Sequence, residues 1–359
     1  MAGSLLTMEA QTVLGPVPAD QLGPTLMHEH VLVDLTCYWS EPDDPADREL
    51  ARVKVAEVSR YTILGTPVGR TTMMILDNLV CDDVGMAATE LRHFGNAGGG
   101  TIVDLTMDGI GTGPRRQRDV LGVREVSDRS GVHIVAGTGY YVHLSHPEHV
   151  ASSRVAELAA WMVTELEEGI AGTGVKAGII GEIGLSAEPH PDELKVLEAA
   201  AIASLETGFT INLHIEPGSP TGHHAARRLL DRSVPPGRVV VGHVDGFIDR
   251  DYLYTLLSLG VTIEFEGFHL DGWQGGRFGF DSATDAERIE VIARLVEQGY
   301  APQIVLAQDL CTKQMYRRYG GVGYDFVPAG VVPRLQDAGV PPSAIDTMLI
   351  HNPARLLAR

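Results

Sequence analysis

The chain has 359 residues, of which 44% are hydrophobic and 21% are charged, which is the composition of an ordinary globular protein with a large core. Lysine and arginine number 28 and aspartate and glutamate number 47, so the formal net charge is -19. Such an acidic chain would repel a nucleic-acid backbone or an anionic membrane surface, so a small-molecule substrate is the expected partner.

Cysteine usage and the N-terminal sequence bear on the compartment. Cys37, Cys81 and Cys311 are far apart and form no C-x-x-C motif, which favours a reducing environment over a disulfide framework. The first residues lack the basic segment and apolar core of a signal peptide. No run reaches the ~18 apolar residues of a membrane helix. We therefore expect a cytoplasmic protein without a membrane span.

Two histidines one residue apart mark the first long strand. Residues 8–24 are predicted to form a hairpin, because Gly-Pro pairs supply turn signals. The hairpin leads into a strand over residues 25–34, where His28 and His30 share one face because side chains alternate along a strand. Two adjacent imidazoles indicate half of a divalent metal site. Two polar residues on a strand that ends at the surface would give the same pattern.

Residues 37–80 form the least regular part of the chain. They begin with an acidic, proline-containing segment over residues 40–47 and continue as mixed helix and loop. We interpret them as an insertion between the first strand and its helix. Such loops often cover a functional site, although a surface excursion without a role would have the same composition.

The remaining chain alternates apolar strands with helices, one of which is a charged helix predicted over residues 115–129. Near-continuous Val/Ile/Leu runs are typical of parallel strands that are buried on both faces. Eight strand–helix units predict a single α/β domain over residues 1–359, a (β/α)8 TIM barrel. An open doubly wound sheet is the alternative, but no G-x-G-x-x-G follows the first strand. The seven further strands are predicted at residues 101–105, 132–137, 177–184, 209–214, 238–243, 261–266 and 303–309.

Several of these strands end in a residue that can bind a metal. The fourth strand carries Glu182, the fifth and sixth end at His214 and His243, and the eighth ends at Asp309. Taken singly, a histidine at a strand end is more often a hydrogen-bonded structural residue, and an aspartate is more often a helix N-cap. In a barrel, however, the carboxyl ends of all strands meet at one rim. The presence of residues that can bind a metal on five strands of one barrel favours a metal centre over five unrelated structural roles.

The number of ligands indicates two ions. Four imidazoles and two carboxylates are too many for one tetrahedral zinc with an open position. They suit two divalent ions that share a bridging carboxylate and a bridging hydroxide, which is a nucleophile at neutral pH. Asp309 can then be both a ligand and the acceptor of the hydroxide's proton. Zinc is the expected metal, and manganese or cobalt would also suit these ligands.

The chain resembles the phosphotriesterase-related branch of the amidohydrolase superfamily over essentially its full length. The matching stretches are Thr25–His30, Gly131–Tyr140, Ala177–Gly184, Val241–Asp245, Ala307–Lys313, Tyr319–Tyr324 and Asn352-Pro353. The resemblance implies a TIM-barrel hydrolase and a homodimer. It also implies two metal sites bridged by the fourth-strand residue, one made by His28, His30 and Asp309 and the other by His214 and His243.

The bridging residue differs from that of the best-studied relatives. Phosphotriesterases and their lactonase relatives use a carboxylated lysine at the end of strand four. The motif Gly181-Glu182-Ile183-Gly184 resembles instead the branch that bridges with glutamate, and Lys176 lies before the apolar run. We therefore assign the bridging and catalytic carboxylate to Glu182 and expect metal binding to be independent of bicarbonate.

A second difference follows the seventh strand. Phosphotriesterases place a proton-relay histidine there, whereas this chain has Gly267 at the corresponding place. His269 could replace the relay histidine from the loop, or it could face solvent.

Five residues are candidates for substrate binding, and each has an alternative role in core packing or on the surface: Tyr140, Tyr141, His269, Trp273 and Lys313. The glutamate-bridged resemblance favours hydrolysis of a carboxylic ester, a lactone or an amide. A phosphotriesterase is the alternative among enzymes. A barrel that retains its metal but serves only for binding is the alternative of another class.

Overall fold

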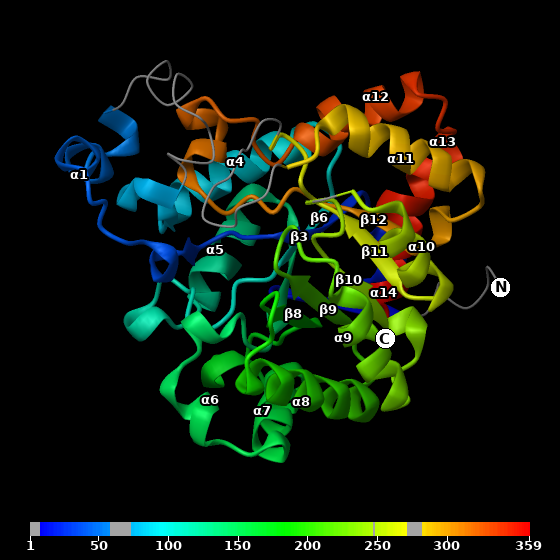
Figure 1. Ribbon diagram of the computed structural model, residues 1–359, viewed down its shortest axis with the longest axis horizontal. Helices are drawn as coiled ribbons and strands as arrows, with labels where there is room; N and C mark the ends of the chain where they lie inside the picture. Colours follow the sequence, from blue (N-terminus) through cyan, green and yellow to red (C-terminus); the bar gives the residue numbers. More distant parts are fainter. Residues whose placement is uncertain (1–7, 58–72, 247, 271–281) are drawn as a thin grey trace.

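The computed structural model describes residues 8–57, 73–246, 248–270 and 282–359. Eight parallel strands form one sheet in the order β12-β11-β10-β9-β8-β7-β6-β3, nearly closed into a barrel with helices around it (Figure 1). All eight predicted strands are present, so the predicted TIM barrel is confirmed. The strands are β3 (Thr25–Glu29), β6 (Thr101–Asp104), β7 (His133–Thr138), β8 (Ile179–Leu185), β9 (Ile211–Ile215), β10 (Val239–Val241), β11 (Thr262–Phe265) and β12 (Ile304–Leu306).

Each crossover helix buries an apolar stripe against the strands, as Leu91 of α4 does, and several begin at an acidic or hydroxyl N-cap. Asp83, Asp249 and Thr284, for example, accept backbone N–H groups of the first turns of α4, α10 and α11. The helices of the barrel are α4 (Val84–Asn96), α5 (Val120–Ser130), α6 (Glu148–Ser152), α7 (Val155–Glu167), α8 (Pro191–Thr207), α9 (Gly222–Asp231), α10 (Arg250–Ser258), α11 (Asp285–Glu297), α12 (Val332–Asp337) and α13 (Pro342–Asp346).

The prediction of a charged helix over residues 115–129 is wrong at its N-terminal end. In the structure α5 begins at Val120, because the Asp119 side chain accepts the N–H of Gly122 and acts as the N-cap. Arg115 and Arg116 precede it with φ angles of 56° and 58°, which an α-helix cannot contain. Charge periodicity alone did not reveal this cap.

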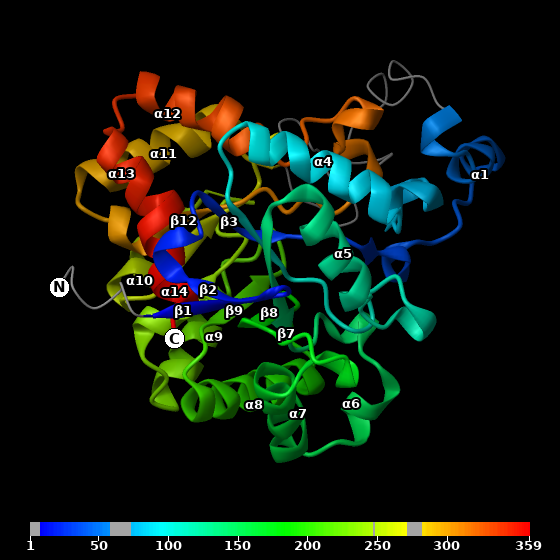
Figure 2. The same ribbon diagram turned by 180° about the vertical axis from the view of Figure 1, so that it is seen from behind.

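The two ends of the described chain close the N-terminal end of the barrel (Figure 2). Strands β1 (Glu9–Thr12) and β2 (Gly15–Pro18) form the predicted antiparallel hairpin, which lies beside the C-terminal helix α14 (Asn352–Leu357). Glu9 and Arg359 exchange backbone hydrogen bonds of 3.2 and 2.9 Å. The hairpin and α14 contribute Ala10, Leu356 and Leu357 to a cluster that includes one residue from each of six barrel strands: Met27, Val103, Val135, Ile179, Val240 and Val305.

The segment predicted as an insertion after the first strand is held at both ends by strand pairing. Strand β4 (Val33–Asp34) pairs antiparallel with β5 (Val80–Cys81), and helix α1 (Pro45–Ala51) lies between them in sequence, at the margin of the molecule (Figure 1). Lys313 Nζ lies 3.1 Å from Asp77 Oδ1, which ties the insertion to the loop after β12. The insertion therefore sits at the rim that carries the predicted ligands.

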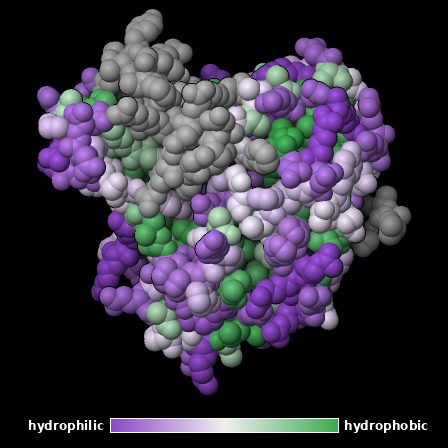
Figure 3. All heavy atoms as spheres, viewed as in Figure 1, coloured by the Kyte–Doolittle hydropathy of each residue, from purple (hydrophilic) through white to green (hydrophobic). Residues whose placement is uncertain are grey.

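The surface is mostly hydrophilic on the face seen in Figure 3, and its hydrophobic side chains occur in small separate groups. Within the described ranges, none of the helices has the length and apolar character needed to cross a membrane.

Candidate metal centre

The predicted ligands lie at the carboxyl ends of the barrel strands. His28 is in β3, Glu182 in β8 and His214 in β9, whereas His243 and Asp309 follow β10 and β12 by two and three residues. His243 and Asp309 adopt φ angles of 53° and 48°, in the left-handed region that non-glycine residues rarely occupy. Each such residue costs on the order of 1–3 kcal/mol, and this kind of strain is concentrated at functional sites.

One group of possible ligands joins the first and last strands. His30 Nε2 lies 3.2 Å from Asp309 Oδ1, and His28 Nε2 lies 4.0 Å from the same oxygen. One ligand atom from each of these three residues lies within 4.8 Å of the others, a spacing that a single ion could bridge. His28 and His30 are buried, while the side chain of Asp309 is 24% exposed.

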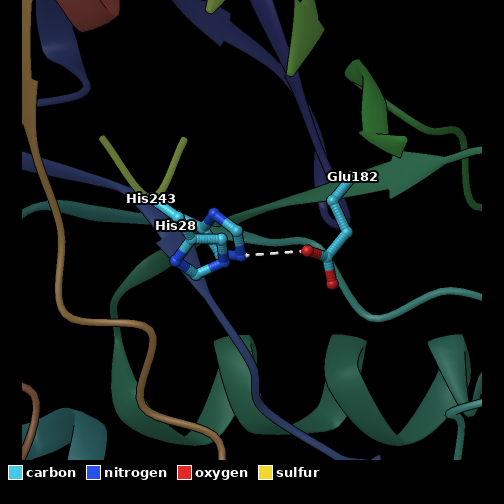
Figure 4. Close-up of side chains that lie close together, drawn as sticks. All are labelled: His28, Glu182 and His243. Atoms are coloured by element: carbon cyan, nitrogen blue, oxygen red, sulfur yellow. Dashed lines mark ion pairs between the residues drawn. The ribbon is translucent and has the colours of Figure 1, made fainter. Parts of the chain in front are cut away.

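A second group surrounds Glu182. Glu182 Oε2 lies 3.3 Å from His28 Nε2, the contact drawn in Figure 4, and 3.0 Å from His214 Nδ1. His214 Nδ1 in turn lies 2.8 Å from His243 Nε2. The other oxygen of Glu182 is 3.6 Å from His30 Nε2. Glu182 therefore lies between the two groups, as a bridging carboxylate must.

Glu266 orients two of the histidines. Its Oε2 lies 2.8 Å from Nδ1 of His28, and its Oε1 lies 2.9 Å from Nδ1 of His243. Both histidines thus turn Nε2 toward the centre. Contact of the outer ring nitrogen with a carboxylate is the usual arrangement behind metal-binding histidines, because it sets the tautomer and raises ligand basicity.

The other two histidines are held in the same way by hydroxyl groups. His30 Nδ1 hydrogen-bonds Thr106 Oγ1 at 3.0 Å, and Thr106 donates to Asp104 at 2.7 Å. His214 Nε2 lies 3.3 Å from the hydroxyl of Tyr141. Each of the four imidazoles therefore uses one nitrogen for orientation and presents the other to the centre.

Electrostatics keep Glu182 of the centre ionised. Burial alone would raise the pKa of Glu182, but attraction to His28 and contact with His214 hold that pKa well below its usual range. Burial would likewise lower the pKa of His28, but the charges of Glu266 and Glu182 raise it well above the ordinary value. The carboxylates are thus ionised at neutral pH and attract positive charge.

The buried polar atoms of the centre fit a metal ion. His28 Nε2 and both carboxylate oxygens of Glu182 are buried and make no well-oriented hydrogen bond with any group in the described part of the chain. Buried polar atoms without partners are costly, and a divalent cation would satisfy all three. Imidazole nitrogen and carboxylate oxygen are ligands that zinc, manganese and cobalt accept.

A pocket opens directly onto these residues. Its polar wall includes Tyr141, His214, His243, Glu266 and Asp309, and Asp245, Ser282 and Arg288 also line it. Its apolar wall comes from the insertion and from the loops after the strands, through Leu35, Tyr38, Met73, Pro217, Leu270 and Cys311. A substrate with an apolar part could therefore lie against the centre.

The two tyrosines predicted to contact substrate have different positions. Tyr141 lines the pocket, and its hydroxyl accepts a 2.9 Å hydrogen bond from Tyr38 of the insertion. Tyr140 is also buried, but its hydroxyl lies 2.8 Å from His149 Nε2, and it does not line this pocket. Tyr38 was not predicted, since nothing in the irregular insertion singles it out.

Of the other three candidates for substrate binding, His269 and Lys313 do not line this pocket. His269 is no solvent-facing loop residue: both ring nitrogens are buried, and burial together with Arg288 lowers its pKa to about 4. Lys313 pairs with Asp77 of the insertion. Trp273 lies outside the described residues.

A buried ion pair packs against Gly267. Arg288 Nε lies 2.8 Å from Asp245 Oδ2, and both side chains are inaccessible to solvent or nearly so. A Cβ on Gly267 would lie 2.4 Å from Arg288 Nη2. Any larger residue at position 267 would therefore require the buried guanidinium to shift.

Sequence reasoning missed Glu266, Asp245 and Arg288. The sequence does contain a signal that could have identified Glu266. Glu264 and Glu266 are two residues apart in an apolar strand, so their side chains share one face, as those of His28 and His30 do. Arg288 carries none, since charged residues recur along its helix and nothing in the sequence sets this one apart.

Comparison with known proteins places the chain in a family. Residues 8–357 match the model of the phosphotriesterase family. The N-acetyltaurine hydrolase of Salmo salar is 32% identical over 358 residues, which cover 99% of both chains. The crystal structure of a resiniferatoxin-binding protein from Rhodobacter sphaeroides superposes with a TM-score of 0.91 at 32% identity, covering 98% of this chain and 96% of that one.

The phosphotriesterase homology protein of Escherichia coli, solved with phosphate in its active site, matches with a TM-score of 0.75 at 27% identity, over 94% of this chain and 99% of its own. The predicted resemblance is thereby confirmed, and so is the expectation of a hydrolase. The chain belongs to the phosphotriesterase family.

Proposed function

We propose that this protein is a binuclear metal-dependent hydrolase that cleaves an amide, with carboxylic esters and lactones as the related alternatives. The observation that carries the proposal is the convergence of four imidazoles and two carboxylates, each imidazole oriented by a second partner. We infer that His28, His30 and Asp309 hold one divalent ion, that His214 and His243 hold the other, and that Glu182 bridges them.

The choice of an amide rests on the names of relatives. The Salmo salar protein, which matches this chain over 99% of its own length at 32% identity, is named for hydrolysis of N-acetyltaurine. N-acetyltaurine contains an acyl amide bond. The glutamate at the bridging position was already expected to favour carbonyl substrates over phosphotriesters. We therefore expect N-acylated amines that carry a small polar or anionic group to be better substrates than phosphotriesters.

The residues have distinct roles in this proposal. Two divalent ions, when bound, lower the pKa of a coordinated water toward about 7 and polarise the scissile carbonyl. Asp309 is positioned to accept the proton of the attacking water, because its carboxylate is partly exposed to the pocket and its neighbours His30 and His28 keep it ionised. It can then pass the proton to the departing amine. Tyr141 and Tyr38 hold His214 and form part of the pocket wall.

Metal content tests the centre directly. Purified protein, loaded with zinc or manganese and passed through gel filtration, should retain two equivalents by elemental analysis. Glu182→Gln should lose at least one, because an amide is a poor bridging ligand. Added bicarbonate should not be needed for metal binding by the wild type and should not restore the lost metal to Glu182→Gln. Retention of both ions by Glu182→Gln, or rescue by bicarbonate, would contradict the assignment of Glu182.

Turnover tests the reaction. N-acetyltaurine, an aryl ester, a simple lactone and a phosphotriester should be compared with and without added metal, using Asp309→Asn as the inactive control. We expect metal-dependent cleavage of the amide with the highest kcat/KM. Faster cleavage of the phosphotriester would establish the alternative enzyme. If the metal-loaded protein cleaves none of these four compounds, the result would support the alternative of a non-catalytic binding protein. The Rhodobacter sphaeroides relative is named as a binding protein, which agrees with that alternative.

The oligomeric state and the cellular location of the protein stay predictions. The family resemblance suggests a homodimer, which light scattering on the purified chain would test. A cytoplasmic location follows from the cysteine usage and would be tested by cell fractionation.

A further inference from the structure

A second group of metal-binding side chains lies away from the barrel centre. His143 and His146 belong to the loop after β7, and Asp192 lies in the first turn of α8, on the side of the barrel where α6, α7 and α8 pack (Figure 1). One ligand atom from each of the three residues lies within 4.8 Å of the others.

His146 presents a free lone pair. Its Nε2 lies 2.7 Å from the backbone oxygen of Tyr141. A carbonyl can only accept, so Nε2 carries the proton and Nδ1 is the unprotonated nitrogen. Nδ1 is buried and finds no hydrogen-bond partner in the described ranges.

Asp192 is fixed in the orientation that a ligand needs. Lys195 Nζ lies 2.9 Å from its Oδ1 and is itself anchored to the backbone oxygens of Val150 and Ala151. The second oxygen, Oδ2, lies 3.6 Å from Nδ1 of His143 and equally far from Nδ1 of His190.

The ring of His143 is also held in place. It stacks on the ring of His190, with 3.5 Å between ring centroids and 16° between planes. His190 is the N-cap of α8, and its Nδ1 accepts the backbone N–H of Asp192. Outer contacts thus orient all three possible ligands, as they do around the ligands of established metal sites.

We propose that His143, His146 and Asp192 form a third, peripheral binding site for a divalent transition-metal ion. Two imidazoles and one carboxylate suit zinc, cobalt or copper, and the exposure of His143 leaves room for water to complete the coordination. The positive charge of Lys195 beside Asp192 makes this site weaker than the barrel centre, where carboxylates outnumber cationic groups.

The site bears on the catalytic pocket through the loop that carries it. His146 holds the backbone of Tyr141, whose hydroxyl contacts His214 in the barrel centre. An ion that joins the loop to α8 would therefore restrict the backbone beside a ligand of the catalytic ions. We expect occupancy to stiffen this wall of the pocket.

The test compares metal content between matched variants. Wild type, His143→Gln and Asp192→Asn would be saturated with zinc, passed through gel filtration and analysed for bound metal. His224→Gln, which alters an exposed histidine at the start of α9, is the control. We expect wild type and control to hold one equivalent more than the two variants. Since the readout is this difference, it does not depend on how many ions the barrel centre holds.

A spectroscopic arm gives an independent readout. The barrel centre is first filled with zinc, and cobalt(II) is then added. Cobalt(II) bound by the peripheral histidines should give a visible absorption band in wild type and in the control. The band should be missing in His143→Gln. Equal metal content in all four proteins, or the same cobalt band in His143→Gln, would overturn the proposal. Unchanged circular dichroism of the variants would show that they are folded.

Discussion

The side chain of Glu29 holds the backbone on both sides of Asp309. Its Oε1 accepts the N–H of Gln308 at 2.8 Å, and its Oε2 accepts the N–H of Leu310 at 2.9 Å. Glu29 ends β3 and Asp309 follows β12, so this buried carboxylate joins the first and last strands of the sheet. The same two hydrogen bonds set the unusual backbone conformation of a proposed ligand and proton acceptor.

Glu29→Gln should therefore weaken both the fold and the reaction. The amide NH2 of glutamine would face a backbone N–H, so one buried donor would lose its acceptor, at a cost of about 1–3 kcal/mol. Urea denaturation should show this loss of unfolding free energy, and kcat should fall because Asp309 is no longer held. Glu57→Gln, at an exposed position in the insertion, is the matched control and should behave like wild type. Normal kcat in Glu29→Gln would show that Asp309 does not depend on this contact.

Replacement of Glu266 should weaken metal binding without touching a proposed ligand. Glu266 contacts Nδ1 of both His28 and His243, and loss of such an outer partner lowers metal affinity by about 10–100-fold. Competition with a chromogenic chelator would measure the change in Glu266→Gln.

Glu264→Gln is the control for that experiment. Burial and the charge of Glu266 raise the pKa of Glu264, so its carboxyl is largely protonated near neutral pH and glutamine mimics it closely. Its Oε2 accepts from Asn212 Nδ2 at 2.9 Å, a bond that the glutamine oxygen can keep. Equal losses of metal affinity in the two variants would argue against a specific orienting role for Glu266.

His269 should make the fold sensitive to mild acid. Burial and the nearby Arg288 lower its pKa to about 4 from 6.5, so the unfolded chain binds a proton between these pH values that the folded chain does not. The contribution of neutral His269 is fully present above pH 6.5 and is lost as pH falls toward 4, by about 3 kcal/mol at most.

Unfolding free energies of wild type and His269→Gln, measured from pH 7 to 4, would test this prediction. The difference between the two proteins should shift in favour of the variant as pH falls. A constant difference across the range would mean that His269 titrates normally in the folded state.

Gly267 should tolerate no side chain while Arg288 is in place. A Cβ there would lie 2.4 Å from Nη2 of Arg288, which is buried and bound to Asp245 and Ser282. Gly267→Ala is expected to lower stability by about 1–3 kcal/mol, as overpacking in a core does.

Gly95→Ala offers the matched comparison. Gly95 is the next-to-last residue of α4, and a Cβ there would meet Val132 at 3.4 Å, an ordinary contact. This change should stabilise the protein by about 0.5 kcal/mol at most, because alanine favours a helical backbone but the position lies in the last turn. Thermal unfolding of both variants would suffice; a neutral Gly267→Ala would mean that Arg288 can move aside and that a relay histidine is not excluded by packing.

The amino-acid sequence by itself determined the strands and the residues at their ends. Parallel strands buried on both faces need continuous apolar runs, so all eight could be located from local composition, and His28, His30, Glu182, His214, His243 and Asp309 stand out because polar residues interrupt those runs. The start of α5 was misplaced because a single cap, Asp119, outweighed a long charged pattern.

Only the tertiary structure decided which groups support those proposed ligands. Glu266, Tyr38 and Arg288 act through neighbours that are distant in sequence, and no local periodicity encodes such pairs. The same holds for Gly267, whose small size is required by Arg288 of a different element. Contacts of this kind depend on how the strands and helices pack, and packing is fixed by the whole chain rather than by any one segment.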